Sequence, residues 1–254
     1  CPVRPVLSPE QMRAQIDLDI QDDGLPLGDV VQLLRQVLAA TPTTASSSFY
    51  NQLFAGRDGA AVLGDTLVSL LNNSMYTYKI GGVQVLIEMA LLEQMGQMMG
   101  MSNSDGMFTP GGSLSNFCAV MVARNEVVPD AHDNGLYGKR LRIYSSTAGH
   151  YSIRKAATMS GIGRDNVVRV AVDDRGRMVP EALETAIQAD LDAGYLPTMI
   201  NATTGTTVLG AFDPLDAIAD IAAKYGIWMH TDAAFGGSMR FHPDFIEHFE
   251  GIER

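Results

Sequence analysis

The sequence predicts an α/β protein built on a largely parallel sheet with helices on both faces. From Phe108 onward, short apolar runs alternate with segments in which apolar residues recur at helical spacing. The runs are continuously apolar, which is typical of strands buried on both faces. Pro180 and Pro214 stand where two of the helices should begin, and proline suits the first helical turn. Strands and helices that alternate in this way form βαβ units.

The expected elements follow one another closely in this part of the chain. A first helix should follow the glycine and serine turn at 110–116 and end near 125. The expected strands are 141–146, 167–172, 198–202 and a run that begins at 227, and the expected helices between them are 152–159, 180–191 and 214–224. No internal repeat or low-complexity stretch is evident.

Residues 1–80 are expected to form an N-terminal helical arm and a pocket-lining segment, and residues 81–254 a larger domain. Helical apolar spacing at 30–38 predicts a helix in the arm. A polar stretch then leads into the aromatic run Phe49–Leu53, whose polar members Asn51 and Gln52 fit either a pocket wall or a turn. A long helix at 83–99 is expected to bury most of one apolar face.

Composition excludes several classes of protein. The 254 residues carry a net charge of −11, which argues against a nucleic-acid or anionic-membrane partner because both need a basic surface. Two cysteines cannot form a disulfide framework and fit a reducing compartment. There is no apolar run of transmembrane length and no signal-peptide pattern. We therefore expect a soluble, cytoplasmic protein.

Asp232 stands at the carboxyl end of the last expected strand, where parallel sheets bind ligands. A buried carboxylate is costly unless a cation meets it, and the two alanines beside it leave room for a flat ligand. We interpret Asp232 as the partner of a protonated ring nitrogen in pyridoxal phosphate (PLP). The spacing His230-x-Asp232 alone would also fit a metal pair or a plain strand end, and we predict no metal site.

Three further groups should reach the same edge of the sheet. The turn Gly111–Ser115 offers bare N–H groups and hydroxyls at a helix start, which suits one phosphate or an ordinary capped turn. His150 follows a strand and could stack on a flat ring, act as acid or base, or be structural. The threonine-rich stretch 201–207 could orient a phenolic oxygen or cap a turn. Together with Asp232, these groups match the four chemical surfaces of PLP.

Six ordered motifs resemble those of the group II PLP-dependent amino-acid decarboxylases, and most closely the glutamate and cysteine-sulfinate branch. The resemblance covers nearly the whole chain from Phe49. The motifs are Phe49-Tyr50-Asn51-Gln52-Leu53, Tyr76-Thr77-Tyr78, the segment Phe108 to Asn116, the segment His150 to Ala156, the segment Asn201 to Thr207, and His230-Thr231-Asp232-Ala233-Ala234. The resemblance implies the large domain of fold type I PLP enzymes and an obligate dimer, here incomplete at its C-terminal end.

The resemblance also implies a role for each matching residue. His150 would stack on the pyridine ring and Asp232 would keep its nitrogen protonated. The remaining assignments are Ala234 beneath the ring, Thr203 near the phenolic oxygen, Gly112, Ser113 and Ser115 at the phosphate, and Asn51 and Gln52 in the substrate pocket.

The implied reaction is α-decarboxylation of a small, acidic amino acid such as glutamate, aspartate or cysteine sulfinate. Two alternatives remain open: another PLP reaction such as oxidative deamination, and a non-catalytic subunit. The family pattern departs at Lys79 and Gly81-Gly82, which replace an acidic residue and Ala-Pro, and at Ser46–Ser48, where His-Pro is common. These departures leave the substrate undefined.

The Schiff-base lysine of the family has no counterpart among the four lysines of this chain, Lys79, Lys139, Lys155 and Lys224. In the family it follows the aspartate motif by a segment that would begin near Arg254. We therefore expect a complementary polypeptide or C-terminal segment to supply it, and a homodimer or higher assembly.

Overall fold

The computed structural model describes residue 3 and residues 7–20, 22–51, 53–54, 56–102 and 104–254. The chain divides into two compact units, Cys1–Asn73 and Ser74–Arg254. Each is described by itself.

Among its described residues, the first unit contains three helices, α1 (Pro9–Gln15), α2 (Leu27–Ala40) and α3 (Gly59–Leu71). Ser8 caps α1 through a reciprocal capping box with Gln11, and Asp58 caps α3 by accepting from the Ala61 N–H. The helix predicted at 30–38 is confirmed, because these residues lie within α2. Neither α2 nor α3 buries any residue, so both present apolar side chains on the surface.

The second unit begins with α4 (Tyr78–Gly81) and the long helix α5 (Val83–Met98). The bounds of α5 match the prediction, but the expectation that it buries an apolar face was wrong. Gly96 is its only buried residue in the described chain, and Leu86, Ile87 and Met89 are about half exposed or more. The apolar residues of α5 surround the helix instead of lining one side. The helical spacing therefore predicted more burial of these side chains than the described chain provides.

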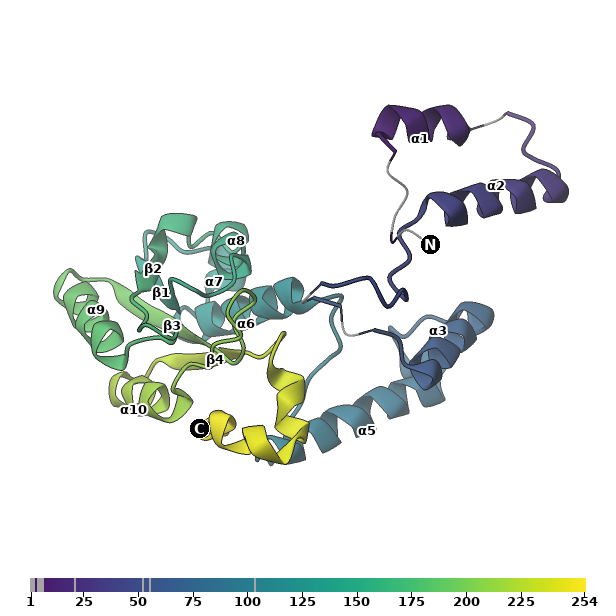
Figure 1. The fold of residues 1–254 in the computed structure, drawn as a ribbon. Helices are drawn as coiled ribbons and strands as arrows, with labels where there is room; N and C mark the ends of the chain where they lie inside the picture. The colour runs from purple at the N-terminus through teal and green to yellow at the C-terminus, as the bar shows by residue number, and fades with distance from the viewer. Residues whose placement is uncertain (1–2, 4–6, 21, 52, 55, 103) are drawn as a thin grey trace. The chain divides into compact units, whose positions relative to one another are not determined.

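A four-stranded parallel sheet forms the centre of the second unit (Figure 1). The strands are β1 (Leu141–Ser146), β2 (Val167–Val170), β3 (Leu196–Thr203) and β4 (Trp228–Asp232), in the spatial order β2-β1-β3-β4. Every neighbouring pair is parallel. The predicted fold class is confirmed.

Helices cover both faces of this sheet and create two cores (Figure 1). On one face, α9 (Pro180–Asp192) and α10 (Leu215–Tyr225) pack on Tyr144 and Ile200. On the other, α6 (Gly112–Val127) and α8 (Ser152–Met159) pack on Ile143 and Met199. Successive strand residues thus face opposite cores, as the period of a strand requires. The remaining short helices are α7 (Ala131–Asn134), η1 (Arg164–Asn166), η2 (Gly237–Phe241) and η3 (Pro243–Phe249).

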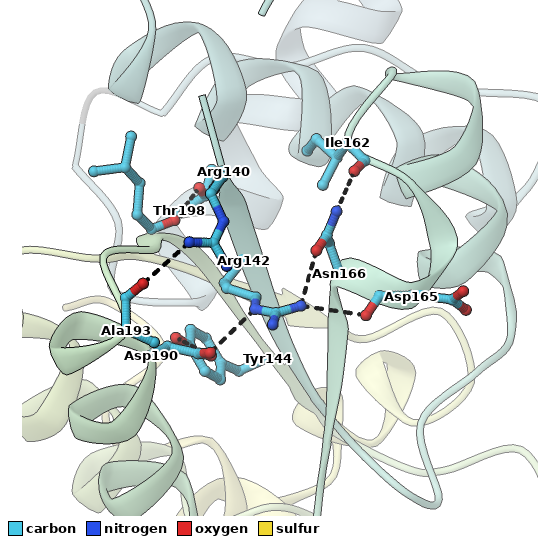
Figure 2. Close-up of polar contacts among 10 residues, drawn as sticks. Arg140, Arg142, Tyr144, Ile162, Asp165, Asn166, Asp190, Ala193 and Thr198 are labelled. Atoms are coloured by element: carbon cyan, nitrogen blue, oxygen red, sulfur yellow. Dashed lines mark hydrogen bonds and ion pairs between the residues drawn. The ribbon is translucent and has the colours of Figure 1, made fainter. Parts of the chain in front are cut away.

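A polar cluster fixes β1 to α9 near the amino end of the strand (Figure 2). Arg142 Nε lies 3.1 Å from Asp190 Oδ1, and the Tyr144 hydroxyl donates to Asp190 Oδ2 at 3.0 Å. Arg142 also donates to Asn166 Oδ1 at 2.8 Å, and its guanidinium stacks over the Tyr195 ring at 3.7 Å. Both carboxylate oxygens of Asp190 therefore have a partner, which is typical of a structural ion pair.

Candidate functional site

One face of the sheet changes from apolar to polar as its strands approach their carboxyl ends. Along β3, Met199 is followed two residues later by Asn201 and then by Thr203, and all three are buried. The strand register places Asn201 beside Ser145 of β1 and His230 of β4. The same register pairs Thr203 with Asp232. Because residues two apart share a face, these polar side chains form one patch beneath α6 and α8.

Asp232 is a buried carboxylate within this patch, with 6% of its surface exposed. Its Oδ2 accepts from Asn116 Nδ2 at 2.8 Å, and its Oδ1 accepts from the Ala234 N–H at 3.1 Å. No cationic side chain pairs with it among the residues that the structure describes. Burying an unpaired charge is costly, so the geometry is suited to a cationic ligand.

Asn116 joins Asp232 to His150. The same Nδ2 that donates to Asp232 also donates to Ser152 Oγ at 2.8 Å. Ser152 Oγ in turn lies 2.8 Å from His150 Nδ1. The side chains of β4, α6, α8 and the loop after β1 are therefore linked by a continuous path of hydrogen bonds.

His230 extends this path on the other side of Asn116. Its Nε2 lies 2.8 Å from Asn116 Oδ1. Burial lowers the pKa of the His230 imidazole, and the nearby charge of Asp232 opposes this only in part. The ring is therefore neutral at physiological pH and occupied by a structural hydrogen bond.

Several buried polar atoms at the carboxyl ends of β1 and β3 lack a partner in the described part of the chain. They are Ser146 Oγ, Asn201 Oδ1, Thr203 Oγ1 and Thr204 Oγ1. Buried polar atoms are almost always hydrogen-bonded in native proteins, so a group of unsatisfied atoms at one sheet edge calls for a ligand or water. Thr203 is the one closest to Asp232 in the strand register.

The backbone of Thr203 is held by Asp213, a second buried carboxylate. Asp213 Oδ2 accepts from the Thr203 N–H at 2.8 Å, and Oδ1 accepts from the Met178 N–H at 2.7 Å. Burial raises the pKa of Asp213 to about 6, although both hydrogen bonds act in the opposite direction. Its two oxygens are occupied by backbone, so Asp213 orients Thr203 and does not face a ligand.

The start of α6 approaches the segment after β4. A Cβ placed on Gly112 would lie 2.7 Å from the Cβ of Ala234, so only glycine fits here without a shift. The N–H groups of Gly112 and Ser113 make no hydrogen bond among the described residues, and no side chain caps the helix. Ser115 Oγ lies 2.6 Å from Thr109 Oγ1. A 16-residue helix with free N–H groups and serine hydroxyls at its start is suited to a phosphate.

Seven of the predicted site residues thus gather at one edge of the second unit. They are Gly112, Ser113, Ser115, His150, Thr203, Asp232 and Ala234. Asn51 lies in the first unit, where its Oδ1 accepts from the Leu53 N–H at 2.8 Å. Gln52 lies outside the described residues.

Asn116 and Ser152 were not predicted, although they complete the path between Asp232 and His150. Each lies on a helix that the sequence places correctly, and each is almost fully buried. A buried polar residue on the inward face of a helix is the signal that could have identified them. The strand pattern held a second signal, because Ser145 and Asn201 interrupt apolar runs.

The donors in this patch fit PLP. They offer an acid, an imidazole, a hydroxyl and a helix start at one edge, and the unsatisfied Thr203 hydroxyl has no other partner in the described chain. No described lysine lies within the polar network: Lys155 Nζ stacks 4.4 Å from the exposed Tyr151 ring, and Lys224 pairs with Glu184. Across the described residues, no group of three or more His, Cys, Asp or Glu side chains could hold a metal ion.

The fold and the site together define a parallel α/β protein with a polar patch at the carboxyl edge of its sheet that fits a cofactor. The Pyridoxal-dependent decarboxylase conserved domain matches residues 9–254, so the chain belongs to this family.

Similar proteins agree with this assignment. The chain is 43% identical over 247 residues to the acidic amino acid decarboxylase GADL1 of Xenopus tropicalis, covering 97% of this chain and 48% of that protein. It is 41% identical over 247 residues to human cysteine sulfinic acid decarboxylase, covering 97% of this chain and 50% of that protein. The crystal structure of mouse CSAD superimposes with a TM-score of 0.96 at 40% identity, covering 99% of this chain and 54% of that one. The chain therefore spans about half the length of the relatives that it matches.

Proposed function

We propose that the protein containing this chain is a PLP-dependent decarboxylase that releases CO2 from the α-carboxylate of a small acidic amino acid. The observation that carries the proposal is Asp232, a buried carboxylate without a cationic partner in the described chain, joined by hydrogen bonds to His150. PLP, when bound, supplies a conjugated electron sink for the electron pair that the departing CO2 leaves behind. The family description supports the same cofactor.

The proposed roles follow from where the side chains lie. Asp232, which is almost fully buried, would stabilise positive charge on the ring nitrogen and so act electrostatically. His150 stacks on the ring. Thr203, held in place by Asp213, donates its unsatisfied hydroxyl to the phenolic oxygen.

The phosphate is proposed to lie at the start of α6. The free N–H groups of Gly112 and Ser113 and the hydroxyls of Ser113 and Ser115 would bind it, helped by the positive end of the helix dipole. Ala234, whose Cβ lies close to Gly112, would support the ring from below.

The acidic class of substrate is supported by the relatives, which are named for acidic amino acids and cysteine sulfinate. Asn51 and Gln52 are proposed to contact the substrate. The proposed substrates are glutamate, aspartate and cysteine sulfinate.

The proposal includes a homodimer and a further segment that carries the lysine for PLP. Long apolar surfaces support both partners: α2, α3 and α5 expose large hydrophobic side chains that a monomer rarely leaves in water. No described helix is long and apolar enough to cross a membrane. We place the protein in the cytoplasm because two cysteines in 254 residues suit a reducing compartment.

The full-length protein tests this function directly. Carboxyl-labelled glutamate, aspartate and cysteine sulfinate are supplied in turn with PLP, and labelled CO2 and dissolved oxygen are followed together. Release of CO2 from one or more of them without oxygen uptake is expected. Oxygen uptake would point instead to oxidative deamination, and a protein that binds PLP but consumes none of the three acids would contradict the proposed reaction.

A further inference from the structure

We infer that Asn116 is a positioning residue that couples the charge on Asp232 to the tautomer of His150. The geometry that carries this inference is a chain of hydrogen bonds from Asp232 through Asn116 and Ser152 to His150, each 2.8 Å long. Its importance for catalysis rests on the proposed function, but the proton positions follow from the hydrogen bonds made to an ionised Asp232.

The direction of the chain is set at Asp232. An ionised carboxylate can only accept hydrogen bonds, so the atom of Asn116 that faces Asp232 Oδ2 must be the amide nitrogen. The amide oxygen then faces His230, and His230 Nε2 must carry a proton to donate to it. This agrees with a neutral His230 whose pKa burial has lowered.

The second hydrogen of the Asn116 amide is donated to Ser152 Oγ. Ser152 therefore accepts from Asn116 and keeps its own hydroxyl hydrogen for His150 Nδ1. The Ser152 backbone N–H also points at His150 Nδ1, at 3.3 Å. Since both groups donate to the same ring nitrogen, Nδ1 is an acceptor and the proton of neutral His150 lies on Nε2.

His150 therefore presents a hydrogen-bond donor to the site at Nε2. A protonated Nε2 has no lone pair with which to act as a base. Each side-chain donor in the path has one acceptor at 2.8 Å, so the charge of Asp232 sets the orientation of the Asn116 amide and of the Ser152 hydroxyl, which is the closer donor to His150 Nδ1. The Ser152 N–H, at 3.3 Å, is a longer contact with the same nitrogen and opposes a reversal of the path. Asn116 can do this because its amide offers two donors and one acceptor, and all three are used. An aspartate there would reverse the path: Ser152 would donate to the new carboxylate, and its oxygen would accept from His150 Nδ1.

The test is the Asn116→Asp variant of the full-length protein, with Asn125→Asp as its control. Asn125 lies on the same helix and takes the same added charge, but it bonds only to Arg124 in the described structure. Solid-state 15N NMR of cofactor-free, histidine-labelled protein reports which ring nitrogen carries the proton, and a His150→Gln variant assigns the signal. We expect the His150 proton on Nε2 in the parent protein and in Asn125→Asp, and on Nδ1 in Asn116→Asp.

The same variants are then assayed for CO2 release. We expect Asn116→Asp to lose about 10- to 100-fold in kcat/KM, the size of effect seen when a residue that orients a metal-binding histidine is lost. The loss should diminish as pH falls, because a proton shared by the two facing carboxylates restores a donor to Asp232. The groups that face this pair are His230 on β4, Ser152 on α8, and His150 through Ser152. Ser152→Ala should abolish the effect of Asn116→Asp on the His150 tautomer.

Several outcomes would overturn the inference. A parent protein with the His150 proton on Nδ1 contradicts it even if Asn116→Asp does not fold. An identical His150 tautomer in the parent and in Asn116→Asp also contradicts it. If instead the proton positions are as deduced but the parent protein releases no CO2, the proposed function fails and the coupling stands.

Discussion

Gly112 and Ala234 approach so closely that a Cβ on Gly112 would lie 2.7 Å from the Cβ of Ala234. This contact joins the start of α6 to the segment that follows β4, and thus brings the proposed phosphate site to Asp232. Gly112 does not occupy the left-handed backbone region, so alanine would be tolerated there except for this contact.

Gly112→Ala should therefore weaken the binding of PLP by separating α6 from Ala234. Overpacking of this kind costs about 1–3 kcal/mol, which corresponds to roughly a 5- to 150-fold change in affinity. The double variant Gly112→Ala/Ala234→Gly should recover most of the loss, because it removes the methyl group on the other side. PLP affinity, measured by absorbance titration of the full-length protein, checks both variants. Gly59→Ala, at the open start of α3, is the control. An unchanged affinity in Gly112→Ala would show that the close contact between Gly112 and Ala234 does not affect PLP binding.

Asp232→Asn should lower kcat by about 100- to 1000-fold, the range seen when one preorganised electrostatic group is removed. The amide keeps the size of the side chain, so the melting temperature should change little. Asp174→Asn, on an exposed turn, changes charge equally and should retain activity. Near-parental turnover in Asp232→Asn would disprove the proposed role of this carboxylate.

Asp213 should make unfolding depend on pH in an unusual direction. Its pKa is raised to about 6 by burial, above the ordinary value near 3.9, so the folded state binds this proton more tightly than the unfolded chain. The contribution of Asp213 to the free energy of unfolding therefore falls as pH rises from about 4 to 6, by roughly 3 kcal/mol in total. The free energy of unfolding, measured with urea at several pH values in this range, should therefore change by this amount more in the parent protein than in Asp213→Asn. Equal slopes would show that Asp213 titrates normally.

Arg142 and Asp190 should contribute to stability rather than to chemistry. Both side chains are about 15% exposed, and Asp190 also accepts from the Tyr144 hydroxyl. Arg142→Met leaves the carboxylate buried without its cation, so the free energy of unfolding should fall by about 3–5 kcal/mol. Lys224→Met breaks the exposed pair with Glu184, which water screens, and should lower the free energy of unfolding far less. Similar losses in the two variants would contradict the structural role of the Arg142 pair.

The sequence was sufficient for the sheet because its strands are short apolar runs separated by well-marked helix starts. The strand 141–146 was predicted at the observed bounds, and α9 begins at Pro180 as expected. The predicted strand 167–172 ends earlier, at Val170, since Val172 makes only an isolated bridge to Met178. The residue at which a strand ends depends on the neighbouring segments, and the local sequence pattern carries no information about those segments.

The candidate site was predictable only where a residue lies at a strand end or helix start. Asp232 and His150 occupy such positions, and so does Gly112. Asn116 lies in the second turn of α6, where its partners come from β4 and α8 and are far away in the sequence. For the same reason, the exposed faces of α5 could not be foreseen, because spacing shows that residues are apolar and not what covers them.

Asp232 is proposed to meet a positively charged ring nitrogen of PLP. The most direct measurement is the 15N NMR shift of PLP labelled at its pyridine nitrogen, bound to the full-length protein before any amino acid is added. We expect the shift of a protonated nitrogen in the parent protein, and a change toward the neutral value in Asp232→Asn. A neutral nitrogen in the parent protein would rule out the proposed pairing with Asp232.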